Sequence, residues 1–250
     1  MKKNIWIIGA SSGIGMELAK IYISQGHNVA ISARTNHLLE NLANENSEFF
    51  KNILPLALDV RNQTDVDVAL KKIIEKWQKI DLLIYASGIY DPEKIRNLDI
   101  QYSKEVIDIN LTSIFNFLLP VVGEMKKNQS GQIALIASVA GYRGLPNSGA
   151  YGASKAAIIN LCESLYVQMR PFNISVSVVN PGFVKSKLTD KNDFKMPFII
   201  EADKAAKIIV EGLNKKKFEI HFPPIFSLIL KILQIIPNSW FLRVSSKMIK

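Results

Sequence analysis

The sequence is poor in cysteine, and its single thiol, Cys162, cannot form an internal disulfide. This scarcity excludes a cysteine-rich metal cluster, and nothing in the composition calls for an oxidising compartment. The chain also lacks an uninterrupted run of about 20 apolar residues, which a membrane-spanning helix needs. We therefore expect a cytoplasmic protein without a metal site, whose apolar C-terminal end is suited at most to peripheral contact with the inner face of a membrane.

Acidic residues are outnumbered, with 22 against 31 basic ones, and the formal net charge is +9. The basic residues are spread along the chain and form no arginine-rich block, so we expect no nucleic-acid partner. With 250 residues, of which 48% are hydrophobic, the chain can bury one sizeable core. We see neither an internal repeat nor a linker, and we therefore predict one domain.

Short apolar runs alternate with longer helical patterns along most of the chain. Strands are expected at residues 5–8, 28–32, 53–57, 82–86, 132–137, 174–179 and 218–222. Helices are expected at residues 14–25, 38–46, 65–77, 101–125, 151–169 and 202–214. Because each pair of parallel strands needs a crossover helix, this alternation predicts an α/β fold: a Rossmann-type, doubly wound parallel sheet of about seven strands with helices on both faces.

A glycine-rich turn, Gly-Ala-Ser-Ser-Gly-Ile-Gly, follows the first expected strand and precedes the first helix. Glycines allow the backbone to approach a pyrophosphate closely, and the free amides at a helix start bind anions. The turn therefore predicts a dinucleotide site, although such turns also serve tight strand-to-helix packing. Its candidate cofactor contacts are Gly9, Ser11, Ser12, Gly13, Ile14 and Gly15.

The second expected strand leads to Arg34, and no acidic residue stands where a dinucleotide fold meets the adenosine ribose. An Asp or Glu would bind the ribose 2′-hydroxyl of NAD, whereas an arginine pairs with the 2′-phosphate of NADP. We therefore predict NADP(H) as the cofactor. The alternative is that Arg34 is a solvated loop residue.

Three residues with complementary chemistry, Ser138, Tyr151 and Lys155, follow the fifth expected strand. Tyr151 and Lys155 are spaced i and i+4, so their side chains lie on one helix face. Reduction of a carbonyl needs a proton at the oxygen, and a nearby ammonium lowers the pKa of a phenol toward the useful range. We expect Lys155 to do this for Tyr151, while Ser138 holds the substrate oxygen. A Tyr-x-x-x-Lys pair by itself is also common on ordinary helix surfaces.

The glycine turn, Ser138, the Tyr-x-x-x-Lys helix and Asn180-Pro181-Gly182 occur together in the order of one family. Over roughly residues 4–222 the sequence resembles the short-chain dehydrogenase/reductases. The resemblance implies hydride transfer between NADPH and a carbonyl or alcohol substrate, with Tyr151 as general acid and base. It also implies that Asn110 opens a helix to a water that links Lys155 to solvent.

The resemblance implies further cofactor contacts in the loops that follow the later strands. It places the adenine against Asp59-Val60, the nicotinamide against residues 181–184, and the carboxamide near Ser186, which replaces a threonine. The loop Tyr85-Ala86-Ser87-Gly88 lacks the two asparagines usual in the family, so their polar contacts must come from elsewhere. The candidate contacts are Asp59, Val60, Ala86, Ser87, Gly88, Tyr151, Lys155, Pro181, Gly182, Val184 and Ser186.

The sequence does not indicate which carbonyl is the substrate. Substrate contacts are expected in residues 139–149 and 183–200, and the second segment is rich in apolar residues: Phe183, Phe194, Met196 and Phe198. An apolar substrate is therefore expected, although packing on the protein's own domain explains these residues equally well. The alternative function is a catalytically idle dinucleotide-binding protein or a membrane- or partner-anchored one. The family resemblance further implies a homodimer or homotetramer through the helices that carry Asn110 and Tyr151.

Residues 223–250 are expected to form a helical extension of the catalytic domain, residues 1–222. Two apolar helical patterns, at 225–236 and 238–249, flank Pro237. The first carries a polar stripe of Ser227, Lys231 and Gln234, and the second a basic stripe of Arg243, Lys247 and Lys250, with Trp240, Phe241, Val244 and Met248 away from it. Such helices suit the surface of an anionic membrane. The alternative is that they pack on their own domain or a sister subunit and close the substrate cleft.

Overall fold

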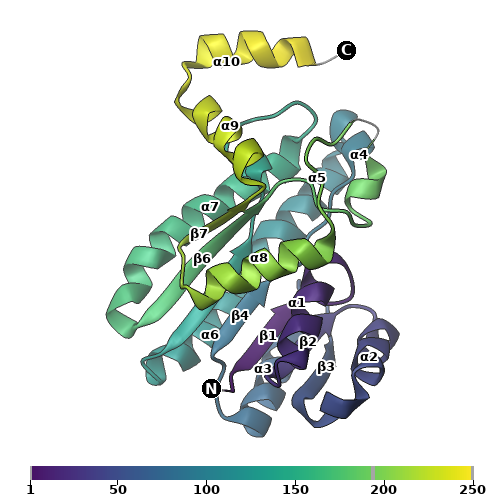
Figure 1. Ribbon diagram of the computed structural model, residues 1–250, viewed down its shortest axis with the longest axis vertical. Coiled ribbons are helices and arrows are strands. Elements are labelled where there is room, and N and C mark those ends of the chain that lie inside the picture. The colour runs from purple at the N-terminus through teal and green to yellow at the C-terminus, as the bar shows by residue number, and fades with distance from the viewer. Residues whose placement is uncertain (1, 193–194, 249–250) are drawn as a thin grey trace.

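Seven parallel strands form one sheet in the structure, a computed structural model that describes residues 2–192 and 195–248 (Figure 1). The strands are β1 (Asn4–Ile8), β2 (Asn28–Ala33), β3 (Ile53–Ala57), β4 (Leu82–Tyr85), β5 (Gly131–Ile136), β6 (Ile174–Pro181) and β7 (Glu219–Phe222). Their order is β3-β2-β1-β4-β5-β6-β7, and every neighbouring pair is parallel. The order reverses between β1 and β4, and such a reversal leaves a crevice at the carboxyl ends of the strands. The predicted doubly wound fold is confirmed.

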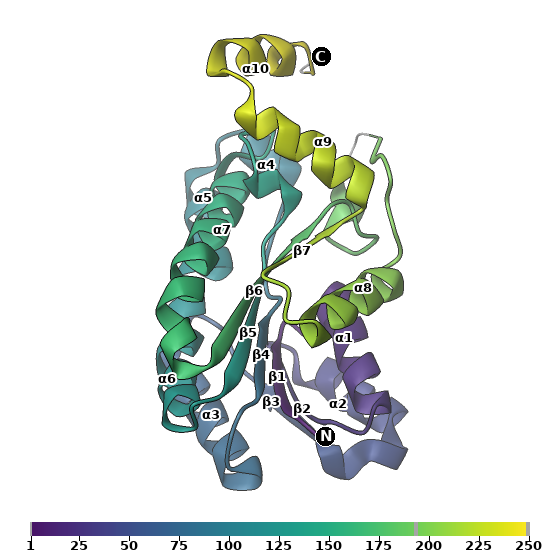
Figure 2. The same ribbon diagram turned by 60° about the vertical axis from the view of Figure 1, so that its left-hand side comes forward.

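Helices cover both faces of the sheet (Figure 2). On one face lie α1 (Gly13–Ser24), α2 (Asn36–Glu45) and α8 (Ala202–Asn214), and on the other lie α3 (Gln63–Trp77), α6 (Ile114–Lys127) and α7 (Gly149–Met169). Each layer encloses its own apolar core. Because both sheet faces are buried, the strands are predominantly apolar, and all five residues of β1 are buried.

The helix expected over residues 101–125 is divided, which corrects the sequence-based boundary. It consists of α5 (Ile100–Ile107), a π-helical turn (Asp108–Thr112) and α6, and a short α4 (Pro92–Arg96) precedes it. Hydroxyl groups hydrogen-bond to the carbonyls of the turn: Tyr85 Oη donates to Ile109 O and Ser113 Oγ to Asp108 O, each at 2.7 Å. Local hydroxyl donors thus stabilise a turn that a continuous apolar periodicity does not reveal.

The helical stretch Ile100–Lys127 is long and apolar enough to cross a membrane by length and composition alone. Its residues Phe117 and Val121, however, are fully buried against the sheet. Core helices of soluble domains have the same composition, so this stretch gives no support for a membrane span.

Two further helices follow β7, namely α9 (Pro224–Ile235) and α10 (Asn238–Ser245), with a short 3-10 turn at Ser246–Met248. Figure 1 shows α9 crossing the carboxyl-end side of the sheet and α10, in yellow, standing beyond the rest of the molecule. The second expected helix is therefore shorter than residues 238–249. Lys250, expected in its basic stripe, lies outside the described residues.

Candidate active site

A cleft of about 310 Å³ opens at the carboxyl ends of the strands. All the predicted cofactor contacts line it, from Gly9 of the first turn to Ser186 after β6, and so do Ser138, Tyr151 and Lys155. Asn110 is fully buried behind the wall. The cleft also includes residues that the sequence reasoning missed: Ala33, Thr35, Leu58, Ile89, Ile109, Ile136, Ala137, Lys187, Leu188 and Thr189. Most of them directly adjoin predicted contacts, so extending each motif by a residue or two would have found them.

The glycine turn needs two of its glycines for close backbone packing. Gly9 has a φ of +87°, and a Cβ there would lie 2.7 Å from the backbone nitrogen of Ser87. A Cβ on Gly15 would lie 2.2 Å from the carbonyl oxygen of Gly9. The turn therefore packs closely against the loop that follows β4 and against the first turn of α1. The start of α1 lines the cleft. The amides there suit a pyrophosphate, because the helix dipole and the free N–H groups both favour negative charge.

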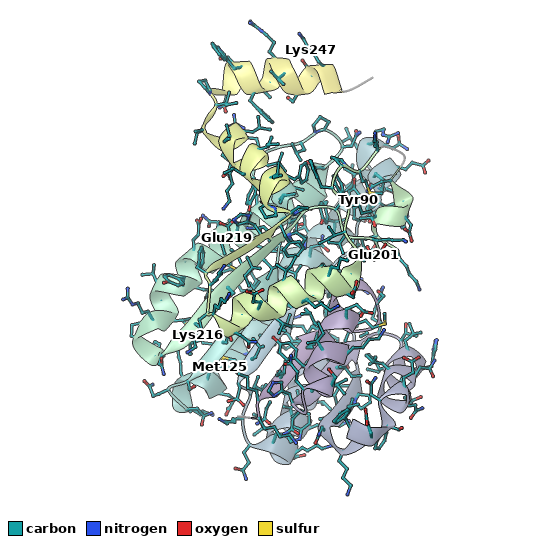
Figure 3. The ribbon with its side chains drawn as sticks, viewed as in Figure 1. Tyr90, Met125, Glu201, Lys216, Glu219 and Lys247 are labelled. Carbon is teal, nitrogen blue, oxygen red and sulfur yellow. The ribbon has the colours of Figure 1, made fainter. Side chains whose placement is uncertain are left out.

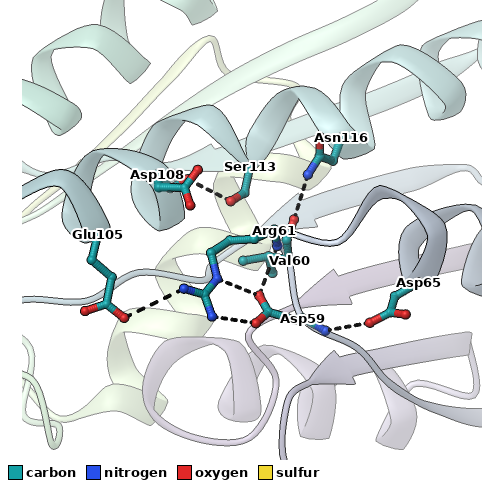
Figure 4. A network of polar contacts seen from close by, with 8 residues as sticks. All are labelled: Asp59, Val60, Arg61, Asp65, Glu105, Asp108, Ser113 and Asn116. Carbon is teal, nitrogen blue, oxygen red and sulfur yellow. Dashed lines mark hydrogen bonds and ion pairs between the residues drawn. The ribbon is translucent and has the colours of Figure 1, made fainter.

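Arg34 and the segment Asp59-Val60 line another part of the cleft. Figure 4 shows the polar contacts of Asp59 and Val60. The Asp59 carboxylate accepts hydrogen bonds from Arg61 Nη2 at 2.7 Å and Nε at 3.1 Å, and Asn116 Nδ2 donates to Val60 O at 2.9 Å. The hydrogen bonds from Arg61 are the main cause that lowers the pKa of Asp59. Asp59 is the one acidic side chain among the described residues of the cleft wall, and Arg61 already neutralises it. The exposed Arg34 thus meets no unpaired acidic group in this wall.

The hydroxyl, phenol and ammonium groups meet where β5 and α7 adjoin the cleft. Ser138 Oγ accepts from Ala140 N at 3.1 Å and donates to Pro181 O at 3.4 Å. Lys155 Nζ donates to Ile136 O at 2.8 Å and lies 5.6 Å from the centre of the Tyr151 ring. Tyr151 and Lys155 come from the first two turns of α7, so the i, i+4 spacing does bring both side chains to one wall.

The expected lowering of the Tyr151 pKa by Lys155 is wrong for this structure. Burial raises the pKa of Tyr151 to about 12, although a hydrogen bond with Ser138 acts in the opposite direction. Burial also lowers the pKa of Lys155 to about 8. The ammonium is held by the carbonyl of Ile136 instead of the phenol, and desolvation outweighs the attraction that the spacing suggested.

The buried Lys155 gives a pH-dependent test of this environment. Its pKa falls from 10.5 to about 8 on folding, so the unfolded chain binds more protons between these values, and stability rises with pH through this window. We expect the stability advantage of Lys155→Met over the wild type, measured by urea unfolding without cofactor, to shrink by about 2 kcal/mol from about pH 7 to about pH 9.5. The exposed Lys71→Met should show no such trend, and a pH-independent difference for Lys155→Met contradicts the lowered pKa.

Asn110 lies in the π-helical turn and ties it to the loop after β4. Its Oδ1 accepts from Ile89 N at 2.8 Å, and its Nδ2 donates to Ile89 O at 3.1 Å. A Cβ on Gly88 would lie 3.3 Å from Asn110 Oδ1 and 3.7 Å from Lys155 Nζ, so both side chains lie close to Gly88. Asn110 and Tyr85 therefore supply polar contacts in the region where the loop lacks the two asparagines usual in similar sequences.

Aromatic side chains pack against two residues of the cleft wall, Tyr151 and Gly182. The rings of Tyr90 and Tyr151 lie 4.7 Å apart. Phe226 of α9 packs on Phe183 and Phe198, with ring centres 5.6 and 6.2 Å apart. The segment after β6 thus packs on the protein's own C-terminal helix while it also adjoins the cleft. Phe194 of this segment lies outside the described residues.

Comparison with known proteins assigns the family. The model of the short chain dehydrogenase family matches residues 3–196, and the chain belongs to that family, as predicted. An uncharacterized oxidoreductase of Myxococcus xanthus is 31% identical over 238 residues, which cover 94% of this chain and 93% of the relative. A 3-oxoacyl-(acyl-carrier-protein) reductase of Buchnera aphidicola is 33% identical over 188 residues, covering 75% of this chain and 76% of the relative. The protein is therefore an oxidoreductase of the short-chain dehydrogenase/reductase family.

Solved structures share its fold. A short-chain dehydrogenase from Streptomyces avermitilis superposes with a TM-score of 0.81 at 20% identity, covering 93% of this chain and 92% of that one. An actinorhodin polyketide ketoreductase solved with NADPH has a TM-score of 0.78 at 22% identity, covering 88% and 94%. A Burkholderia phymatum family member solved with NAD also has a TM-score of 0.78, at 20% identity, covering 92% of each chain. Proteins with this fold thus include one solved with NADPH and one solved with NAD.

Proposed function

We propose that this oxidoreductase is NADP(H)-dependent and interconverts an apolar carbonyl compound and its alcohol. The observation that carries the proposal is one cleft with Arg34 at one end, the glycine turn in its wall and the Ser138–Tyr151–Lys155 group at the other. The residues fit the dinucleotide because glycines leave room for its pyrophosphate and a free guanidinium suits a 2′-phosphate. When bound, the cofactor supplies or accepts the hydride.

The chain's own residues then handle the substrate oxygen and its proton. Ser138 Oγ donates a hydrogen bond to the substrate oxygen and so stabilises the charge that develops there. Tyr151 Oη delivers the proton in reduction and accepts it in oxidation. A phenol with a pKa of about 12 stays protonated at neutral pH, which suits the direction of reduction. The Lys155 ammonium places a positive charge next to this centre while it remains hydrogen-bonded to Ile136 O.

The aromatic end of the cleft supports an apolar substrate. Tyr90 packs on Tyr151, and Phe226, which packs on Phe183, lies against Gly182 of the cleft wall. Apolar surroundings of this kind favour substrates that lose little hydration on binding. The 3-oxoacyl reductases among the relatives act, by their names, on acyl groups, which agrees with this substrate class.

A substrate panel read by NADPH and NADH absorbance tests the proposal. Short and long aliphatic ketones, 3-oxoacyl thioesters, cyclic ketones and aldehydes are compared, each with its alcohol in the reverse direction. We expect turnover with NADPH and an apolar carbonyl. No turnover with any member, while NADPH binds in a fluorescence titration, favours a catalytically idle dinucleotide-binding protein instead.

We further infer that the chain forms a homodimer or homotetramer through the helical layer of α5, α6 and α7. This layer exposes apolar side chains that a single chain does not cover: Leu119 is 75% exposed and Val167 is 71% exposed. Elsewhere in the same layer, Leu98, Ile100 and Ile107 line a second hollow of about 510 Å³. Light scattering is expected to give two or four chains per particle, and a monomer at micromolar concentration contradicts the inference.

A further inference from the structure

Helix α9 turns its polar stripe, together with Phe226 and Leu230, toward the protein and leaves its other apolar residues exposed to solvent. Ser227 is fully buried, with its Oγ 2.6 Å from His221 Nδ1. Lys231 pairs with Glu219, and Gln234 Nε2 donates to Tyr142 O at 2.9 Å. The polar stripe expected from the sequence therefore helps to hold α9 on the domain, whereas the apolar stripe of a surface helix usually does this.

The consequence is a set of exposed apolar side chains on α9 and α10, which we name the outer tail face. On α9 the spacing is i, i+3, i+4 and i+7, so these residues share one side of the helix. Leu228 is 58% exposed, Ile232 51% and Trp240 68%. The outer tail face consists of Ile225, Leu228, Ile229, Ile232, Ile235, Trp240, Leu242 and Val244. Exposed apolar surface of this extent marks an interaction site.

This face is presented rigidly because the domain anchors both helices. Arg143 Nη1 donates to Gln234 O at 2.8 Å, and its Nη2 donates to Asn238 Oδ1 at 2.6 Å. The same guanidinium lies 4.4 Å from the centre of the Phe241 ring, which buries this aromatic side chain on the inner side of α10. In Figure 3, Lys247 labels the α10 end of the molecule, well beyond the sheet.

Charge identifies the class of partner. Residues 223–250 contain four basic residues, Lys231, Arg243, Lys247 and Lys250, and no Asp or Glu. Glu219 neutralises Lys231, whereas Arg243 and Lys247 are exposed beside the outer tail face. A symmetric contact between two such tails would bring like charges together without a compensating carboxylate from either tail. An anionic lipid surface instead complements both the apolar and the basic groups.

The dimensions of α9 determine how it meets a bilayer. Its 12 residues extend about 18 Å at 1.5 Å per residue, which is short of the hydrocarbon thickness of about 30 Å. A helix of this length with one apolar side lies in the interface plane and does not cross it. We propose that the outer tail face docks the protein peripherally on an anionic membrane, independently of its enzymatic activity.

Point substitutions test this docking better than removal of the tail. Leu230 and Phe226 of α9 pack with Val139 and Tyr142, close in sequence to Ser138, so truncation would disturb the catalytic segment as well. The double substitution Leu228→Glu/Ile232→Glu changes only exposed positions of the outer tail face. Its matched control is Phe50→Glu/Val68→Glu, at residues 56% and 49% exposed far from the tail. Each pair replaces two neutral residues by two carboxylates and takes the formal net charge from +9 to +7.

The measurement is co-sedimentation with vesicles of equal parts phosphatidylglycerol and phosphatidylcholine, or of phosphatidylcholine alone, with circular dichroism to verify folding. We expect the wild type and the control to bind the anionic vesicles alike. The affinity of Leu228→Glu/Ile232→Glu for these vesicles should be lower by at least about tenfold. The wild type should bind neutral vesicles more weakly than anionic ones, and about 0.5 M salt should weaken its binding to the anionic vesicles. Equal binding of all three proteins, or no binding of the wild type, overturns the proposal. If Leu228→Glu/Ile232→Glu changes the oligomeric state in light scattering and the wild type does not bind lipid, the outer tail face contacts a second copy of the chain, and this result also overturns the proposal.

Discussion

Replacement of Tyr151 by phenylalanine is expected to lower kcat for carbonyl reduction by about 10²–10⁴-fold. The substitution removes the hydroxyl that we propose delivers a proton to the substrate oxygen, and it leaves the ring in place. The pKa of about 12 for Tyr151 means that the wild type keeps this proton at neutral pH. KM for NADPH and thermal stability should change little, because only one hydroxyl group, which is hydrogen-bonded to Ser138, is lost.

A matched control for this experiment lies on the same helix. Tyr166 of α7 is 43% exposed, and its ring packs on Phe218 at the far end from the cleft. Tyr166→Phe should retain wild-type turnover under the same conditions. If Tyr151→Phe kept a kcat near that of Tyr166→Phe at saturating substrate, the role of Tyr151 as general acid would be refuted.

Removal of the Arg34 guanidinium is expected to weaken NADPH binding much more than NADH binding. Only NADPH carries the 2′-phosphate, and a charge-assisted contact of this kind contributes about 1.5–3 kcal/mol, so the ratio of the two Kd values should change about tenfold or more in Arg34→Ala. Fluorescence titration with both cofactors gives the ratio directly. Arg34 is well placed for this role because Arg61 already pairs with Asp59, the acidic side chain of that wall.

The control for Arg34→Ala removes the same charge elsewhere. Arg170 follows the C-terminal end of α7, away from the residues that line the cleft, and Arg170→Ala should leave the ratio of Kd values unchanged. If both variants shift NADPH binding equally, the effect comes from the net charge of the protein. An unchanged ratio in Arg34→Ala excludes the proposed phosphate contact.

Much of the fold followed from local patterns. Strands such as Ile5–Ile8 are continuous apolar runs because both sheet faces are covered, and the runs between them have helical periodicity. The division of residues 100–127 was not visible in the periodicity, since α5, the π turn and α6 share one apolar pattern, although the family resemblance implied an opened helix at Asn110. The π turn depends on the hydroxyl of Tyr85, which comes from a strand 24 residues away from Ile109 in sequence. Such contacts become evident only when the chain is folded.

The sequence by itself determined the fold, the family and most of the residues that line the cleft, because glycine spacing, strand-end positions and the i, i+4 pair are local features. Only the tertiary structure decided the electrostatics of that site. Lys155 faces the carbonyl of Ile136, and burial moves its pKa and that of Tyr151 in directions that spacing does not indicate. The tertiary structure also decided the orientation of α9. Glu219, Tyr142 and His221 hold its polar stripe inward, and partners outside the helix leave no periodic signal in the helix itself.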